Sequence, residues 1–190
     1  MKSLLRIAAA FVFAAFLAGP LVAQETAKKT EPPKPAPSPT QALLDTWNYQ
    51  GHKLIAMAED FPEDKYDFKP NPAQRTFAEQ LLHAAGANYY LINAAQGKKM
   101  GEENLPRDKY KTKTEVVAAL KKSFEEGAAL IKAKGDAGMA AEIKNPFGNE
   151  MIRFSDFAYG ILIHAGEHYG QLVVYYRVNN MVPPESRPRK

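Results

Sequence analysis

The chain has 190 residues, a length typical of one domain, and its 25 Lys and Arg residues against 21 Asp and Glu residues give a formal net charge of +4. It contains no cysteine, which excludes disulfide bonds, catalysis by a thiol of its own and an acylated N-terminal cysteine. The basic residues form no concentrated patch with interleaved aromatic residues, so we expect no nucleic-acid partner.

The first 23 residues have the pattern of a secretory signal peptide. Lys2 and Arg6 precede an apolar run over residues 7–18, and the small residue Ala23 precedes the first polar segment. An uncleaved membrane anchor is the alternative, but the apolar run is shorter than the roughly 20 residues that a spanning helix needs. We therefore expect residues 1–23 to be cleaved and the protein to be secreted or periplasmic, without a membrane partner.

Two further segments flank the expected domain. Residues 24–40 carry five of the chain's 14 prolines and have no apolar face to bury, so we expect an extended, solvated linker. Residues 186–190 form a short basic tail. The stretch between them, residues 41–185, is long enough for one domain with a well-buried core.

The first two predicted helices have clear start and stop signals. Thr40 is the expected cap of the first helix, and Pro62 ends it. The second helix opens with Thr76-Phe-Ala-Glu79, a capping box in which the threonine oxygen accepts from the third amide and the glutamate reaches back. We expect it to run to about Gln96 and to stop at Gly97.

The third and fourth predicted helices complete the apolar pattern. The third opens with a second capping box, Thr112-Lys-Thr-Glu115, and is expected to end near Gly135. The fourth is expected to start at Ser155 and to continue to about Asn179. No stretch alternates as a strand would, so the predicted fold is all-α.

The predicted architecture is a four-helix bundle with long connections. Residues 61–75, 97–113 and 135–154 are all longer than the short turns of an up-down bundle. Each connection could run along most of the bundle, so we expect at least one crossover, with consecutive helices parallel.

Two of the four histidines lie together in the fourth predicted helix. His164 and His168 are four residues apart, which places both imidazoles on one face about one turn apart. Such a pair can bind one metal ion in adjacent coordination positions. The same face carries apolar residues, including Ile161 and Leu172, so both rings should point into the bundle. A metal ion or hydrogen bonds from neighbouring helices could satisfy their buried nitrogens.

A third ligand would have to come from another helix, and His83 is the candidate. It lies midway along the second predicted helix, where Gly86 and Ala87 leave space for a metal ion or ligand and Tyr90 could supply a hydroxyl. The fourth histidine, His52, is expected to face solvent and is not included in the site.

Two segments resemble the DinB-like family of four-helix bundles. The stretch from Phe61 to His83, FPEDKYDFKPNPAQRTFAEQLLH, is similar to the segment that leads to the family's first metal histidine. The stretch His164-Ala-Gly-Glu-His168-Tyr-Gly-Gln171 resembles the family's final helix. The resemblance implies that His83, His164 and His168 are the three metal ligands. It also implies a bundle with crossover connections and a homodimeric assembly, which is frequent in the family.

The resemblance also implies a class of activity. Some members are metal-dependent thiol S-transferases or isomerases that use a low-molecular-weight thiol, whereas many have no established activity. The signal peptide would take this chain away from the cytosol, in which such thiols are abundant and reduced. That location argues against a thiol transferase and leaves the metal site unaffected.

Three imidazoles favour zinc, and nickel and other first-row ions are also compatible. Three protein ligands leave a position open to water or to a small thiol or carboxylate, through a cleft that we expect Tyr90 and Gln171 to border. One function is therefore a metal-dependent transferase or hydrolase, and the other is non-catalytic metal or partner binding. The candidates to support a ligand histidine from behind or to contact a substrate are Glu79, Gln80, Tyr90 and Gln171, although the capping box already occupies Glu79.

A lesser alternative is a metallopeptidase. His164-x-x-Glu167-His168 matches the H-x-x-E-H signature, in which the glutamate is the general base. Those enzymes take a third ligand from further downstream, and Glu185 is the only carboxylate side chain after His168. Without a third ligand downstream, the five-residue motif is weak evidence for a metallopeptidase.

Overall fold

The computed structural model describes residues 33–102 and 104–188. The predicted signal peptide and most of the proline-rich linker lie outside the described residues. The chain divides into two units, Met1–Pro35 and Ala36–Lys190, and only residues 33–35 of the first are described. In the first unit, residues 33–35 have no helix or strand. The second unit holds all the elements that follow, and none of its described helices is long and apolar enough to cross a membrane.

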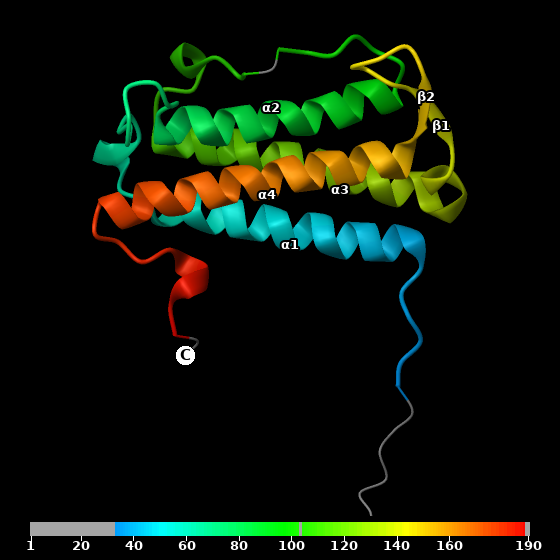
Figure 1. Ribbon diagram of the computed structural model, residues 1–190, viewed down its shortest axis with the longest axis horizontal. Coiled ribbons are helices and arrows are strands. Elements are labelled where there is room, and N and C mark those ends of the chain that lie inside the picture. Colours follow the sequence, from blue (N-terminus) through cyan, green and yellow to red (C-terminus); the bar gives the residue numbers. More distant parts are fainter. Residues whose placement is uncertain (1–32, 103, 189–190) are drawn as a thin grey trace, which may run out of the picture. The chain divides into compact units, whose positions relative to one another are not determined.

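Four long helices build the second unit, as predicted (Figure 1). They are α1 (Pro39–Asp60), α2 (Phe77–Ala95), α3 (Lys113–Met139) and α4 (Phe154–Val178). Short 3₁₀ turns lie in the connections and after the last helix: η1 (Glu63–Lys65), η2 (Arg107–Lys109) and η3 (Pro184–Ser186). The all-α, four-helix-bundle prediction is confirmed.

The helices are arranged in the order α1, α3, α2, α4 around the bundle, because each of these packs against the next and α4 packs against α1. Helices α1 and α2 therefore occupy opposite corners, as do α3 and α4. Figure 1 shows α2 and α3 running in the same direction, with the connection between them passing back along the bundle. The predicted crossover with parallel consecutive helices is thus located between α2 and α3.

Helix starts follow the sequence signals with one exception. Both predicted capping boxes are present, since Thr76 Oγ1 accepts from the Glu79 amide (3.1 Å) and Thr112 Oγ1 accepts from the Glu115 amide (3.2 Å). The predicted Thr40 cap is wrong, because Ser38 caps α1. Pro39 fits the first helical position and moves the start of the helix two residues upstream.

Two glycines shape the helix ends. Gly97 has a φ of 65°, a left-handed conformation that suits glycine, and it follows the end of α2 as predicted. Gly135 has a φ of 60° and interrupts α3, after which one further turn continues to Met139. Helix α4 begins at Phe154, one residue before the predicted start.

The expectation of no strands is wrong for the connection between α3 and α4. There β1 (Glu142–Lys144) and β2 (Met151–Arg153) form an antiparallel hairpin in which Ile143 is opposite Ile152. Three-residue strands are too short for alternation to be recognisable in the sequence. Ile143 is buried and anchors the hairpin to the bundle.

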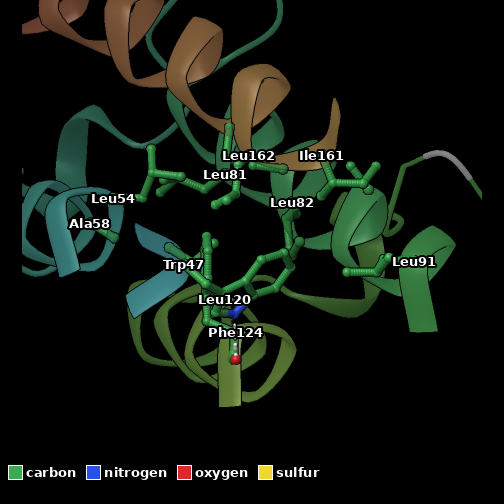
Figure 2. Close-up of a cluster of buried hydrophobic side chains, with 14 of the residues drawn as sticks. Trp47, Leu54, Ala58, Leu81, Leu82, Leu91, Leu120, Phe124, Ile161 and Leu162 are labelled. Carbon is green, nitrogen blue, oxygen red and sulfur yellow. Dashed lines mark hydrogen bonds between the residues drawn. The ribbon is translucent and has the colours of Figure 1, made fainter. Parts of the chain in front are cut away.

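The core of the bundle joins helices that are distant in sequence. Trp47 of α1 is fully buried and donates from Nε1 to the Phe124 carbonyl of α3 at 2.8 Å (Figure 2). The centroids of the Trp47 and Phe124 rings are 5.4 Å apart. The approach depends on Gly127, where an added Cβ would lie 2.2 Å from the Trp47 ring. Leu81 and Ile161 extend the same core towards α2 and α4.

The C-terminal segment is tied back to the end of α1. Arg187 pairs with both carboxylate oxygens of Asp60, at 2.8 and 2.5 Å. The Tyr176 hydroxyl of α4 lies 2.8 Å from the Met57 carbonyl and 3.2 Å from the same carboxylate. Asp60 thus joins α1, α4 and the tail at one end of the bundle.

Candidate metal centre

Three histidine side chains converge between α2 and α4. His83 comes from α2, and His164 and His168 come from successive turns of α4. The Nε2 atoms of His83 and His164 are 3.1 Å apart, and those of His168 and His164 are 3.0 Å apart. Within residues 33–102 and 104–188, this is the one group of three or more potential ligand side chains close enough to hold a metal ion. The structure therefore brings the three predicted ligands together.

The helices position the three rings by their spacing and packing. The four-residue separation of His164 and His168 stacks their side chains on the face of α4 that meets α2. The small buried residue Ala87, one turn after His83 on α2, lies beside His83 and His164 in the wall of one cavity. His83 and His168 are 5% and 3% exposed, whereas His164 is half-buried.

Amide oxygens fix the outer nitrogens of two rings. His83 Nδ1 donates to Asn104 Oδ1 (3.0 Å), and His168 Nδ1 donates to Gln80 Oε1 (2.7 Å). Because an amide oxygen can only accept, both Nδ1 atoms carry a hydrogen and both Nε2 atoms present a lone pair. This is the arrangement in which an imidazole binds a metal ion through Nε2.

The cluster fits a divalent ion chemically. A hydrogen on His164 Nε2 could be donated to only one of the two neighbouring Nε2 atoms, so in any neutral state at least one Nε2 lone pair receives no hydrogen from the other two rings. A shared cation could accept the lone pairs of all three Nε2 atoms. Nitrogens bound tetrahedrally to one zinc ion at 2.0–2.1 Å lie about 3.3–3.4 Å apart, within a few tenths of an ångström of the separations here.

The surroundings also favour the neutral form of His168. Burial, followed by the nearby His164, His83 and Arg75, lowers the pKa of His168 to about 3. His168 is therefore neutral at physiological pH, and neutral imidazole is the form that binds metals.

The predicted contact residues separate into two roles. Gln80 orients His168, and its Nε2 donates to Gln171 Oε1 (2.7 Å) and lies 3.4 Å from the Tyr175 hydroxyl. Gln171 therefore supports Gln80, which in turn contacts the candidate ligand His168. It is not among the residues that line the cavity beside the histidines, which corrects the expectation that it borders the cleft. Glu79 accepts from the Thr76 amide (2.7 Å) in the capping box, as expected.

Sequence reasoning missed Asn104, the partner of His83. It lies in the connection between α2 and α3, which has no apolar periodicity to place its residues. The crossover brings this connection back along the bundle (Figure 1), and Asn104 contacts His83. The sequence contains no signal for this contact beyond the unusual length of the connection.

A cavity of about 580 Å³, which we call the α2–α4 cavity, lies beside the histidines. His83 and His164 form part of its wall, and Tyr90 borders it as predicted. Its other wall residues are Ala87, Met100, Phe147, Phe157, Gly160 and Ile161. An ion held by the histidines would therefore adjoin a space of ligand size.

The remaining sequence candidates lie elsewhere. His52 has a side chain 72% exposed, with its Nε2 3.9 Å from Glu185, so it faces solvent as expected. Glu185 is thus beside His52, and Glu167 is exposed on α4 outside the metal-ligand group. Because the third histidine comes from α2, the metallopeptidase alternative loses the downstream ligand that it requires.

Comparison with known proteins agrees with this geometry. The sequence pattern of the DinB superfamily matches residues 46–172. Among curated proteins, none matches the chain.

Three solved structures share the fold. A DinB-like protein from Bacillus cereus is 17% identical with a TM-score of 0.64, covering 76% of this chain and 95% of that one. A DinB-like protein from Bacillus subtilis is 19% identical with a TM-score of 0.60, covering 78% and 99%. YfiT from Bacillus subtilis, described as a probable metal-dependent hydrolase with an unusual four-helix bundle topology, is 14% identical with a TM-score of 0.61, covering 80% and 94%.

Proposed function

The chain belongs to the DinB superfamily, and from this premise we propose that it is a metal-dependent hydrolase acting on a small molecule beside His83, His164 and His168. The observation that carries the proposal is the convergence of the Nε2 atoms of three histidines, two of which, His83 and His164, line a cavity. Three protein ligands leave a position of a divalent ion open, whereas a structural zinc site is closed by a fourth. The description of YfiT supports the same class of activity.

Zinc is the ion that we propose, because three neutral imidazoles suit it, and nickel is its main competitor. When bound, such an ion supplies a Lewis acid and lowers the pKa of a water molecule. The protein's contribution is to hold the donor nitrogens in place. Asn104 and Gln80 do this for His83 and His168 through the Nδ1 hydrogen bonds.

A second candidate function is small-ligand binding without turnover. Hydrolysis benefits from a general base near the reacting water, and none of the described residues that line the α2–α4 cavity is an Asp or Glu. Tyr90 supplies the one hydroxyl in that wall. This composition is the observation behind the second candidate, and turnover is the property that separates it from the hydrolase.

Elemental analysis of protein purified without a histidine tag tests the site first. We expect about one ion per chain, with most of it lost in His83→Ala, His164→Ala and His168→Ala and retained in His52→Ala. Equal metal content in all four variants would overturn the site.

Turnover is then measured on the zinc-loaded and the metal-stripped protein with a panel of small esters, amides and lactones. Hydrolysis that depends on zinc supports the enzyme. If zinc binds at one ion per chain and none of these substrates is hydrolysed, small-ligand binding without turnover replaces the hydrolase as the proposed function.

Location and assembly are proposals that rest on the sequence. The N-terminal pattern supports an exported protein, and the family resemblance supports a homodimer. Mass spectrometry of protein from the native envelope should find a mature chain that begins near Gln24, and light scattering should give twice the chain mass. Retention of residues 1–23 in the folded product would overturn export.

A further inference from the structure

The wall of the α2–α4 cavity carries no charged side chain among the described residues. Its polar groups are the two histidines at one end and the Tyr90 hydroxyl. A second cavity nearby, of about 370 Å³, is different, because Lys69, Arg75, Glu79 and Arg107 line it. A ligand in the α2–α4 cavity would therefore meet charge only beside the histidines, where the proposed metal ion binds. Binding of phosphorylated or multiply charged molecules is disfavoured for this reason.

Aromatic rings form one side of this cavity. The Phe147 ring lies 6.0 Å from the Tyr90 ring and 5.9 Å from the Phe157 ring, inclined at 68° and 60°. These separations are typical of interacting aromatic pairs. Tyr90 and Phe157 are 9% and 7% exposed, whereas Phe147 is 66% exposed. Phe147 thus keeps a large apolar surface in water beside a cavity that other aromatic residues also line.

The hairpin turn fixes the position of Phe147. The Phe147 amide donates to Asn145 Oδ1 (2.9 Å), and the Asn145 amide donates to the Glu150 carbonyl (2.9 Å). The paired strands follow directly, with Lys144 opposite Met151. The backbone that carries this exposed ring is therefore held by local hydrogen bonds, as the wall of a binding site would require.

Small residues leave space in another part of the cavity wall. Ala87 and Gly160 both line it, and a Cβ added at Gly160 would have no atom within 4 Å. The cavity is thus bounded in part by aromatic rings, and it is unfilled next to Gly160 of α4. Its volume is in the range that accommodates ligands of drug size.

We infer that the α2–α4 cavity binds a ligand with an uncharged aromatic body and a single anionic head, and that Phe147 determines this specificity. The head lies at the histidine end, and the body lies among Tyr90, Phe147 and Phe157, where it covers the exposed ring. The position of the head rests on the proposed metal site, whereas the preference for an aromatic body rests on the cavity wall alone.

Calorimetric titration of the zinc-loaded protein with three carboxylates tests this inference. We expect 3-phenylpropionate to bind at least tenfold more tightly than propionate, because burial of the phenyl group is favourable. Succinate, which carries a second charge in place of the ring, should bind no better than propionate. Equal affinities for 3-phenylpropionate and propionate would overturn the inference.

Variants test which residues are responsible for the preference for an aromatic body. Phe147→Ala should weaken 3-phenylpropionate binding by about three- to tenfold and leave propionate binding and zinc content unchanged. Met151→Ala is the matched control, because Met151 is a 54% exposed apolar residue on the same hairpin and does not line the cavity. Gly160→Leu should fill the cavity and weaken 3-phenylpropionate binding by at least tenfold, with zinc content retained. Equal losses in Phe147→Ala and Met151→Ala would overturn the role of Phe147.

The neutral probe 3-phenylpropanol separates this inference from the proposed function. If zinc fails to bind and metal-stripped wild type still binds this alcohol more tightly than Phe147→Ala does, the metal function fails and the aromatic cavity stands. A different result would remove the cavity inference alone. If zinc binds at one ion per chain, 3-phenylpropionate binds no more tightly than propionate, and 3-phenylpropanol binds wild type no more tightly than Phe147→Ala, the cavity inference fails and the metal site stands.

Discussion

His168 Nδ1 lies 2.7 Å from Gln80 Oε1, and this contact between α4 and α2 determines which nitrogen of His168 faces the other histidines. Gln80 is itself oriented by Gln171, to which it donates at 2.7 Å. Both glutamines lie outside the α2–α4 cavity. They therefore influence the metal site without contacting a ligand there.

We expect Gln80→Ala to lower metal affinity by about 10- to 100-fold, because His168 loses the acceptor that fixes its ring and tautomer. Competition against a chelator of known affinity measures the change. Gln171→Ala should have a smaller effect, since it acts through Gln80. Gln96→Ala, an exposed glutamine at the end of α2, is the control. Unchanged affinity in Gln80→Ala would contradict an orienting role.

Asn104 makes a similar contact with His83 from a connection instead of a helix. Asn104→Ala should lower metal affinity by about tenfold or more, because the Nδ1 hydrogen of His83 loses its acceptor. Asn104→Asp should restore affinity to at least the wild-type level, since a carboxylate accepts the same hydrogen bond and adds a favourable charge. A failure of aspartate to rescue would indicate that Asn104 acts only on the local backbone.

The Asp60–Arg187 pair predicts a pH-dependent contribution to stability. The hydrogen bond from Arg187 holds the pKa of Asp60 below its ordinary value of 3.8. The stabilisation is therefore complete above that value and is lost as the pH falls through the folded pKa. Asp60→Asn should lower the free energy of unfolding by at most about 1 kcal/mol at pH 7, because the pair is partly exposed.

Urea denaturation at pH 7 and pH 3 measures this dependence. The difference between wild type and Asp60→Asn should shrink at pH 3. Asp45→Asn removes an exposed carboxylate that accepts from Gln41 nearby on α1, and it should show little difference at either pH. A constant deficit of Asp60→Asn across this range would rule out the ionic origin of the stabilisation.

Gly127 provides a test of the core. Gly127→Ala should destabilise the protein by about 1–3 kcal/mol, because the new Cβ would lie 2.2 Å from the fully buried Trp47 ring. Gly170→Ala on α4 is the matched variant, since its Cβ would have no atom within 4 Å, and it should stabilise by about 0.5–1 kcal/mol. Thermal unfolding compares the two, and equal effects would contradict the packing argument.

The sequence predicted those features that repeat or have fixed local chemistry. Helical periodicity locates the four helices, the capping boxes at Thr76 and Thr112 fix the starts of two of them, and the spacing of His164 and His168 indicates the centre of the candidate site. The β1–β2 hairpin and the Asn104 contact were not predictable in this way. Both depend on where long connections return in space, which local patterns do not encode.

The order of the helices around the bundle has a consequence for the rate of folding. In the described part of the chain, α2 and α3 are the one consecutive pair with an extensive interface, and a long crossover joins them. No two helices can therefore assemble first as a local hairpin. The contact of Trp47 with Phe124 joins residues that are 77 positions apart in the sequence, and that of His83 with His164 joins residues 81 positions apart. Because such distant contacts must form before the core is stabilised, this bundle should fold more slowly than an up-down bundle of equal length.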